Sequence, residues 1–250
     1  MPALARRLLA EFTGTGLLVA VVVGSGIMAA RLSPGQPGLE LLENTLATVA
    51  GLAVIIVVLA PVSGAHLNPV VTAADWALGR RSGSGLPGRD ALAYLVAQTA
   101  GAAGGAVLAN LMFALPAVSV SRTARSAPHL WIGELVATAG LVLVVFALAR
   151  SGRGKLAPAA VAGWIGAAYW ATSSTSFANP AVTIGRAFSD TFAGIAPGSV
   201  PGFIVAQLVG GGLGLVLVLV FYPSRPAAPA EPAADARQTA AAGAVPPAAS

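Results

Sequence analysis

Cysteine, histidine and charge are the scarce features of this sequence of 250 residues. No cysteine is present, so disulfide bonds, thiolate metal ligands and cysteine nucleophiles are excluded. The histidines are His66 and His129, too few for a histidine metal site, and we expect neither a metal nor another cofactor. Charged residues make up 9% of the chain, whereas a soluble domain carries about 25%. The shortage of charge therefore argues against a soluble protein.

Long apolar segments fill the sequence instead. The mean hydropathy is +0.80, and apolar runs recur as far as residue 222, so the first run is not a cleavable signal peptide. About 20 helical residues cross the hydrocarbon core of a bilayer. Six segments are long enough: about 8–30, 40–60, 90–114, 130–149, 156–174 and 200–222. The predicted fold class is an all-α membrane protein with six transmembrane helices.

The basic residues predict an orientation for these spans. They sit in short loops and form no stripe or arm, so the net charge of +5 does not indicate a nucleic-acid partner. Loops rich in lysine and arginine stay in the cytoplasm. The basic residues assigned to that side are Arg6, Arg7, Arg80, Arg81, Arg89, Arg150, Arg153, Lys155 and Arg225. We therefore expect a multi-pass protein of the plasma or inner membrane with both termini cytoplasmic.

The chain also repeats itself in inverted orientation. In each half, a Glu-x-x-x-Thr sequence opens a span, a second span follows, and an Asn-Pro pair comes next. The glutamates are Glu11 and Glu134, and the pairs are Asn68-Pro69 and Asn179-Pro180. Repeat one covers about 6–115 and repeat two about 128–222. Since each half has three spans, the two halves enter the membrane from opposite sides.

Each Asn-Pro pair is expected to open a short helix, about 68–77 and 179–188. Asparagine is a favoured N-cap, and proline suits the first helical turn because its missing N–H would be unpaired anyway. Ten residues span ~15 Å, about half of the hydrocarbon core. Two such half-helices would meet near the midplane, where irregular backbone is tolerated only if it is buried or lines a cavity. The pattern therefore predicts a pore.

These features together resemble the aquaporin (major intrinsic protein) family. Segments 63–72 and 177–183 resemble its paired Asn-Pro-Ala loops, although the first reads Asn-Pro-Val with Val70. The resemblance covers about 6–222, so we expect 1–222 to be the channel domain and 223–250, rich in Pro and Ala, to be a disordered cytoplasmic tail. It implies the aquaporin fold, with two re-entrant half-helices, and a homotetramer in membrane lipid with a pore in each protomer.

The resemblance also assigns roles to residues. Asn68 and Asn179, with Pro69 and Pro180 behind them, are expected to point amide N–H groups into the pore. Glu11 and Glu134 are expected to hold the two loops through backbone hydrogen bonds. His66 either organises the first loop or reaches the pore, and Ala178 belongs to the second loop.

The selectivity filter is where the sequence departs from the family. Most members carry arginine directly after the second Asn-Pro-Ala, where this chain has Val182. Arg186 lies one helical turn further on, and we do not expect it to substitute, because it starts from a different depth. The other filter positions are predicted to be Thr48, or Ala50 if the span carries an indel, with Ala167 and Ser176.

A wide, uncharged filter predicts passive passage of small uncharged solutes: water, glycerol-like polyols and neutral metalloid hydroxides such as arsenous acid, with protons and ions excluded. A water-selective aquaporin and a secondary transporter are the alternatives. A transporter needs a coupling site, whereas Glu11 and Glu134 have a structural explanation, and Asp75 and Asp190 suit helix-end or loop contacts. We do not expect an enzyme, because no carboxylate pair, metal cluster or nucleophile–base set is visible.

Overall fold

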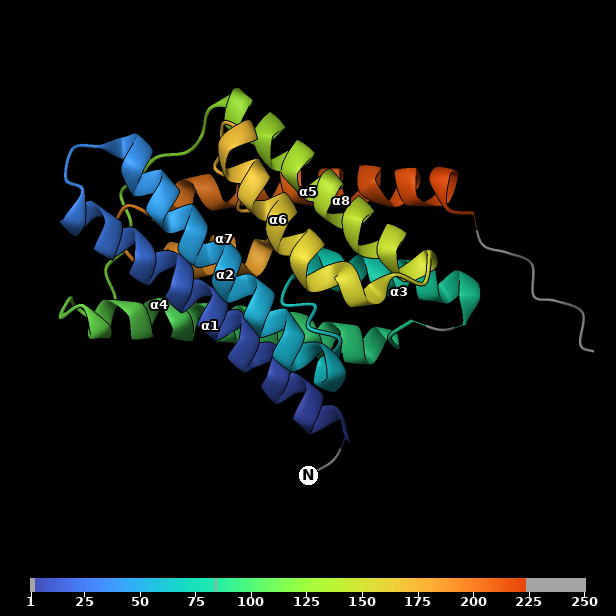
Figure 1. Ribbon diagram of the computed structural model, residues 1–250. Helices are drawn as coiled ribbons and strands as arrows, with labels where there is room; N and C mark the ends of the chain where they lie inside the picture. The colour runs from blue at the N-terminus through green and yellow to red at the C-terminus, as the bar shows by residue number, and fades with distance from the viewer. Residues whose placement is uncertain (1–2, 84, 224–250) are drawn as a thin grey trace, which may run out of the picture.

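The computed structural model describes residues 3–83 and 85–223, apart from the side chains of 81 and 82. The tail predicted for 223–250 lies, except for Pro223, outside the described residues. The elements run α1 (Ala3–Leu32), α2 (Pro37–Ser63), α3 (Pro69–Ser82), α4 (Gly88–Met112), α5 (Pro128–Arg150), η1 (Gly154–Leu156), α6 (Ala157–Ala171), α7 (Pro180–Arg186), η2 (Pro197–Ser199) and α8 (Val200–Phe221). Figure 1 shows long helices crossing one another around the shorter α3 and α7. This all-helical fold is the predicted class.

Five of these helices are long and apolar enough to cross a membrane, namely α1, α2, α4, α5 and the stretch from η2 through α8. The sixth predicted span, 156–174, is shorter: α6 ends at Ala171, and only together with η1 does it cover 154–171. The polar run 172–175 explains the early end. Thr172 donates its hydroxyl to Ala168 O at 2.7 Å, which satisfies a carbonyl of the last turn as the chain becomes extended.

Glycines set how closely the long helices cross. The most extensive contacts are between α1 and α4 and, in the second half, between α5 and α8. A Cβ atom at Gly105 would overlap Gly16 O, and one at Gly210 would overlap Leu135 O. Without these side chains the backbones approach directly, as small residues allow in membrane helices. The two helix pairs therefore occupy equivalent places in the two halves.

Each half-helix packs against a long helix from the other half of the chain. Helix α3 packs against α8, α7 packs against α4, and the two contact each other. The 14 residues of α3 extend ~21 Å and the seven of α7 ~10 Å. The boundaries differ from the predicted 68–77 and 179–188: α3 continues to a left-handed C-cap at Gly83 (φ 73°), and α7 ends after two turns. The half-helices are therefore unequal in length.

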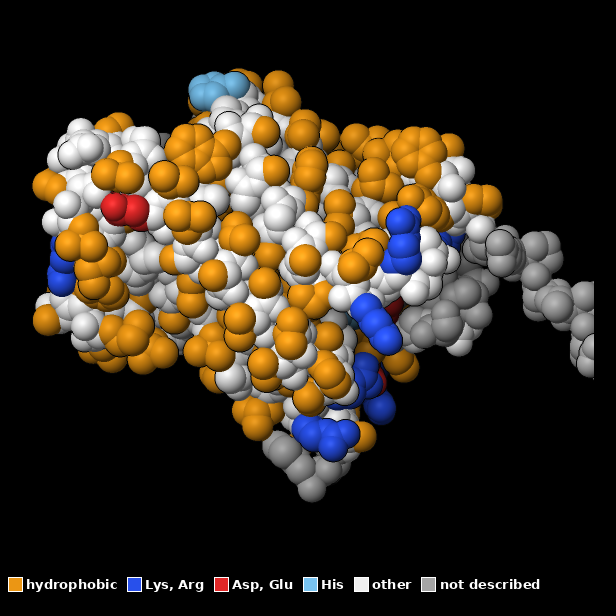
Figure 2. All heavy atoms as spheres, in the orientation of Figure 1, with side chains coloured by type: hydrophobic (Ala, Val, Ile, Leu, Met, Phe, Trp, Pro, Cys, Tyr) orange, Lys and Arg blue, Asp and Glu red, His pale blue; other side chains and the backbone are white. Residues whose placement is uncertain are grey.

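The surface is suited to lipid. Figure 2 shows apolar side chains over most of the visible face, and lysine and arginine side chains gathered mainly at the end where the N-terminus lies. Val57 and Val58 on α2 and Val96 on α4 are each about 60% exposed. Exposing such apolar side chains to water would be unfavourable. A bilayer removes that penalty, because lipid tails are as apolar as these side chains.

Candidate functional site: a paired asparagine pore

Asn68 and Asn179 cap the two half-helices and reach across to one another's loops. The Asn68 side-chain oxygen accepts from Val70 N at 2.9 Å, and that of Asn179 accepts from Ala181 N at 3.0 Å. Because backbone N–H can only donate, these bonds fix which amide atom is oxygen. The Asn68 amide nitrogen then donates to Ala178 O, and that of Asn179 to Leu67 O, both at 2.7 Å. The asparagines therefore lie together where the half-helices meet.

The loops before the asparagines use strained backbone to make these contacts. Leu67 (φ 52°) and Ala178 (φ 49°), each one residue before its asparagine, are left-handed, and so are Ala65 and Ser176, each three residues before it. Such residues cost of order 1–3 kcal/mol each and persist only where the surroundings hold them. The same alternation in both loops is a property of the repeat. Its result is that the residue before each asparagine presents its carbonyl to the opposite asparagine.

Glu11 holds the first loop. Its carboxylate accepts from His66 N at 3.0 Å, Leu67 N at 2.7 Å and the Ser63 hydroxyl at 2.6 Å. Gln98 on α4 donates to the same carboxylate at 2.8 Å and to the Thr72 hydroxyl at 2.9 Å. Glu11 is completely buried. A buried carboxylate persists when its oxygens are hydrogen-bonded, and here they orient the strained backbone.

Glu134 repeats this arrangement in the second loop. Phe177 N and Ala178 N each donate to its carboxylate at 2.8 Å, as does the Gln207 amide at 2.6 Å. The Gln207 amide also donates to the Thr183 hydroxyl at 2.8 Å. Gln98 and Gln207 were not predicted as site residues, although each follows Val-Ala in its repeat, at 96–98 and 205–207. That shared tripeptide is the signal that could have revealed them.

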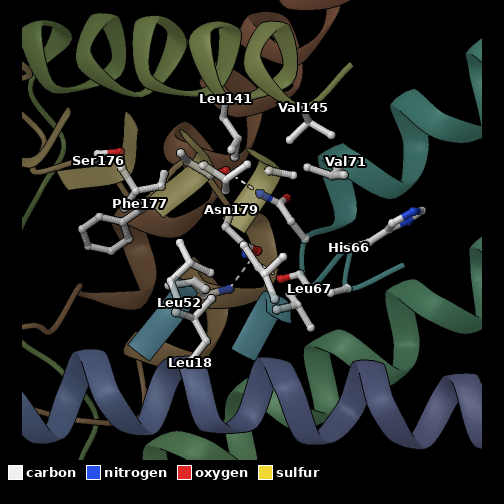
Figure 3. Close-up of a pocket in the computed structure, with 18 of the residues that line it drawn as sticks. Leu18, Leu52, His66, Leu67, Val71, Leu141, Val145, Ser176, Phe177 and Asn179 are labelled. Carbon is white, nitrogen blue, oxygen red and sulfur yellow. Dashed lines mark hydrogen bonds between the residues drawn. The ribbon is translucent and has the colours of Figure 1, made fainter. Parts of the chain in front are cut away.

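One cavity of about 240 Å³ contains both asparagines. Its lining includes Gly64 and His66 of the first loop and Ser176, Phe177 and Arg186 of the second half. Figure 3 shows His66 and the pair Ser176 and Phe177 on opposite sides of Asn179. The prolines do not line the cavity: Pro69 and Pro180 occupy the first helical turn behind the asparagines. One cavity is therefore lined by both loops, including the two asparagines where the loops meet.

The end of the cavity at His66 is formed by the first loop. His66 lies on the lining, and its Nδ1 atom is 3.2 Å from the Thr72 hydroxyl. Its ring meets the Tyr94 ring edge-on with centroids 5.6 Å apart. The structure thus gives His66 both of the positions considered from sequence, a contact within the loop and a place on the cavity wall. Asp75, also on the lining, accepts from Leu86 N at 3.0 Å and so holds the α3–α4 connection.

Three of the four predicted filter residues lie on the cavity wall at its other end: Thr48, Ser176 and Val182. Ala50, the alternative to Thr48, is exposed. The prediction for α6 was wrong, because Ala167 is exposed and Tyr169, two residues on, faces the cavity instead. Counting back from Asn179 without gaps cannot allow for the irregular stretch 172–178, which sets the rotation of α6. The Tyr169 hydroxyl donates to the Thr48 hydroxyl across the wall at 3.4 Å.

Comparison with known proteins agrees with this geometry. The family model described as major intrinsic protein matches residues 1–177. The chain belongs to the major intrinsic protein family. It is 48% identical over 224 residues to aquaglyceroporin AqpS of Rhizobium meliloti, covering 89% of this chain and 93% of that protein. A second family member, the glycerol uptake facilitator protein of Pseudomonas aeruginosa, is 33% identical over 272 residues, covering 92% and 94% of the two chains.

A solved structure confirms the fold of this family member. The aquaglyceroporin from Plasmodium falciparum superposes with a TM-score of 0.61 over 86% of this chain and 95% of its own, at 23% identity. The predicted all-helical aquaporin fold is therefore confirmed.

Proposed function

We propose that this protein is a passive transmembrane channel for small uncharged solutes of the glycerol class, and that it catalyses no chemical step. The observation that carries the proposal is the single cavity that passes both Asn68 and Asn179. One side of the cavity wall is apolar and the other is polar. Leu52, Leu141 and Val161 offer an apolar side, while the loop backbones and the asparagines offer a polar side. A polyol, with carbon on one face and hydroxyls on the other, suits such a wall.

The asparagine pair supports exclusion of protons. Each amide has two N–H donors, and one of them is used in the bond to the opposite loop. The other can donate to a solute or water oxygen in the cavity, which turns that molecule's own hydrogens away and interrupts the chain of donors. Each half-helix start also carries roughly +0.5 charge, so two starts at one point repel cations.

The part of the cavity lined by Thr48, Tyr169, Ser176, Val182 and Arg186 is called the mouth below. The residue at position 182 in this mouth favours the passage of solutes larger than water. An arginine there would narrow the passage and place a charge beside it, whereas valine does neither. We extend the proposal to neutral metalloid hydroxides such as arsenous acid, whose hydroxyls resemble those of a polyol. The relatives with aquaglyceroporin and glycerol facilitator in their names support this class of solute.

We further propose a homotetramer in the plasma or inner membrane with both termini cytoplasmic. The gathering of basic side chains at the N-terminal end supports the orientation. Arg150 at the end of α5 donates to Tyr222 O after α8, which supports a shared side for these helix ends. In this orientation the mouth at Val182 and Arg186 faces outward.

Solute flux into reconstituted vesicles tests the channel. Glycerol and arsenous acid should enter well above the rate of empty vesicles, in proportion to the gradient and unaffected by a proton gradient. Val182→Arg should reduce both fluxes about tenfold or more while sparing water. The matched control is Val120→Arg, since Val120 is 58% exposed in the α4–α5 connection and lies outside the cavity. Saturable flux coupled to protons would establish a transporter, and wild-type flux of water alone would establish a water channel.

A further inference from the structure

Arg186, the last residue of α7, lies in the cavity wall in an unusual setting. It is 3% exposed, yet it belongs to the lining at the Val182 end. Its Nε atom donates to Ala193 O, and its guanidinium carbon lies 3.4 Å from the centroid of the Phe177 ring. A hydrogen bond on one side and an aromatic face on another hold the guanidinium in one place.

The helix explains how Arg186 reaches this mouth. Side chains on an α-helix lean toward its N-terminus and cover the turn before their own Cα atom. Arg186 is four residues after Val182, so its long side chain returns over the turn that Val182 occupies. The expectation that Arg186 would not substitute for a filter arginine rested on its depth along the helix. It took account of the Cα position and not of the reach of the side chain.

The charge of Arg186 is not neutralised nearby. Among the described residues, the ion pairs are Arg7 and Arg89 with Asp90, and Arg122 with Asp190, so Arg186 has no carboxylate within 4 Å. Within the described residues its hydrogen bond is the one from Nε to Ala193 O, so the Nη atoms donate to no described group, although the residue is almost wholly buried. A second guanidinium, that of Arg125, lies 5.2 Å from the same Phe177 ring and donates to Gly194 O, which adds to the positive potential.

Several polar groups in the same cavity wall as Arg186 also lack strong partners. The Ser176 hydroxyl is buried and has no hydrogen-bond partner in the described chain. Tyr169 and Thr48 contribute hydroxyls that share one long hydrogen bond of 3.4 Å. A buried polar group without a partner costs free energy, and an oxygen of a passing solute can supply the partner. The mouth is therefore built to receive oxygen acceptors.

We infer that Arg186 is the fixed cation of this mouth and determines its selectivity. Its free Nη–H groups donate to solute oxygens, and its charge repels cations before they reach the asparagines. This inference rests on the proposed channel function and refines it: valine at 182 leaves room for a polyol, while Arg186 keeps the charge barrier.

Tracer exchange in reconstituted vesicles tests the inference, with the solute at equal concentration on both sides. The probes are guanidinium, a small planar cation, and glycerol as the neutral reference. Arg186→Met removes the charge and keeps most of the side-chain length. Arg186→Gln is the second variant, because it retains an N–H donor for Ala193 O. Arg31→Met is the matched control: it removes the same charge from an exposed arginine that donates to Phe113 O outside the cavity.

We expect wild type and Arg31→Met to exchange glycerol and to hold guanidinium near the rate of empty vesicles. Arg186→Met or Arg186→Gln should raise guanidinium exchange about tenfold or more, since tenfold is only ~1.4 kcal/mol and a charge a few ångströms away in a poorly solvated wall exerts more than that. The double variant Val182→Arg with Arg186→Met should restore exclusion by returning a charge to the same mouth.

The inference is overturned if an Arg186 variant that still exchanges glycerol keeps guanidinium at the wild-type rate. It is also overturned if Arg31→Met admits guanidinium as readily as Arg186→Met does. Wild-type vesicles that exchange no glycerol would instead refute the proposed function, so the two failures are distinguishable.

Discussion

The two halves of the molecule are alike where they meet and different at the two ends of the cavity. At the junction, each half contributes the same four residue types in the same network of hydrogen bonds. The pairs are Glu11 and Glu134, Gln98 and Gln207, Thr72 and Thr183, and Asn68 and Asn179. Away from the junction the likeness ends: the first half offers His66 and Asp75 to the cavity, and the second offers Ser176 and Arg186.

This difference separates two tasks. Both halves must hold a strained loop against the other loop, and both do so with the same set of hydrogen bonds. Selectivity for solutes depends on each end of the cavity separately, and the side chains at the two ends differ. Changes at the junction should therefore act on the whole fold, whereas changes at a mouth should act on selectivity and leave the fold intact.

The largest effect is expected from Glu134→Ala and its counterpart Glu11→Ala. Glu134→Ala leaves the N–H groups of Phe177, Ala178 and Gln207 without an acceptor, at about 1–3 kcal/mol for each buried donor. Thermal unfolding in detergent should show a loss of at least about 3 kcal/mol, similar for both glutamates. Glu40→Ala, in the first turn of α2, is the control and should cost under about 1 kcal/mol. Unequal losses at Glu11 and Glu134 would break the equivalence of the halves.

A smaller effect is expected from methyl groups placed in the helix crossings. Gly105→Ala and Gly210→Ala should each lower the free energy of unfolding by about 1–3 kcal/mol, because the added carbon overlaps a facing backbone carbonyl. The controls are Gly104→Ala, whose Cβ would lie 3.9 Å from Phe12 Cζ, and Gly212→Ala, which meets nothing within 4 Å. These should be neutral or stabilising by up to about 1 kcal/mol, since alanine favours helix. Losses at the control sites would contradict the proposed crossings.

The smallest effect is expected at the connection beside α7. The Arg122 backbone and side chain both donate to Asp190 at 2.9 Å, and these bonds hold the pKa of Asp190 below its ordinary value. A lowered folded-state pKa stabilises the fold at neutral pH, and this contribution is lost as the pH falls through that pKa. Asp190→Asn should therefore lower Tm slightly near neutral pH, with the deficit vanishing in acid. A deficit that persists at low pH would show that charge is not its cause.

The junction was largely predictable from the sequence, because it depends on local rules that act twice. An Asn-Pro pair favours an N-cap followed by a first helical turn, and two copies in an inverted repeat predict the meeting point. The contact of Glu11 and Glu134 with the loops was expected from the family resemblance, and loop N–H groups do donate to both carboxylates. The glutamines were missed because a lone Gln in an apolar helix carries no distinctive signal until the two repeats are aligned.

The mouth was less predictable, because its geometry depends on helix rotation and side-chain reach. Tyr169 was missed and Ala167 wrongly chosen, since two residues along a helix change the facing direction by about 200°. Arg186 was set aside on the position of its backbone, although a long side chain on a helix acts a turn away from where it starts. Neither quantity is encoded in spacing alone.

Phe177 joins the two tasks in a single residue. Its backbone N–H is anchored by Glu134, and its ring supports the guanidinium of Arg186. A change that displaces the backbone of Phe177 should therefore also displace the guanidinium that contacts its ring. Grafting this entrance onto another channel would require the anchoring glutamate as well, because Glu134 anchors the backbone of the residue whose ring contacts the guanidinium.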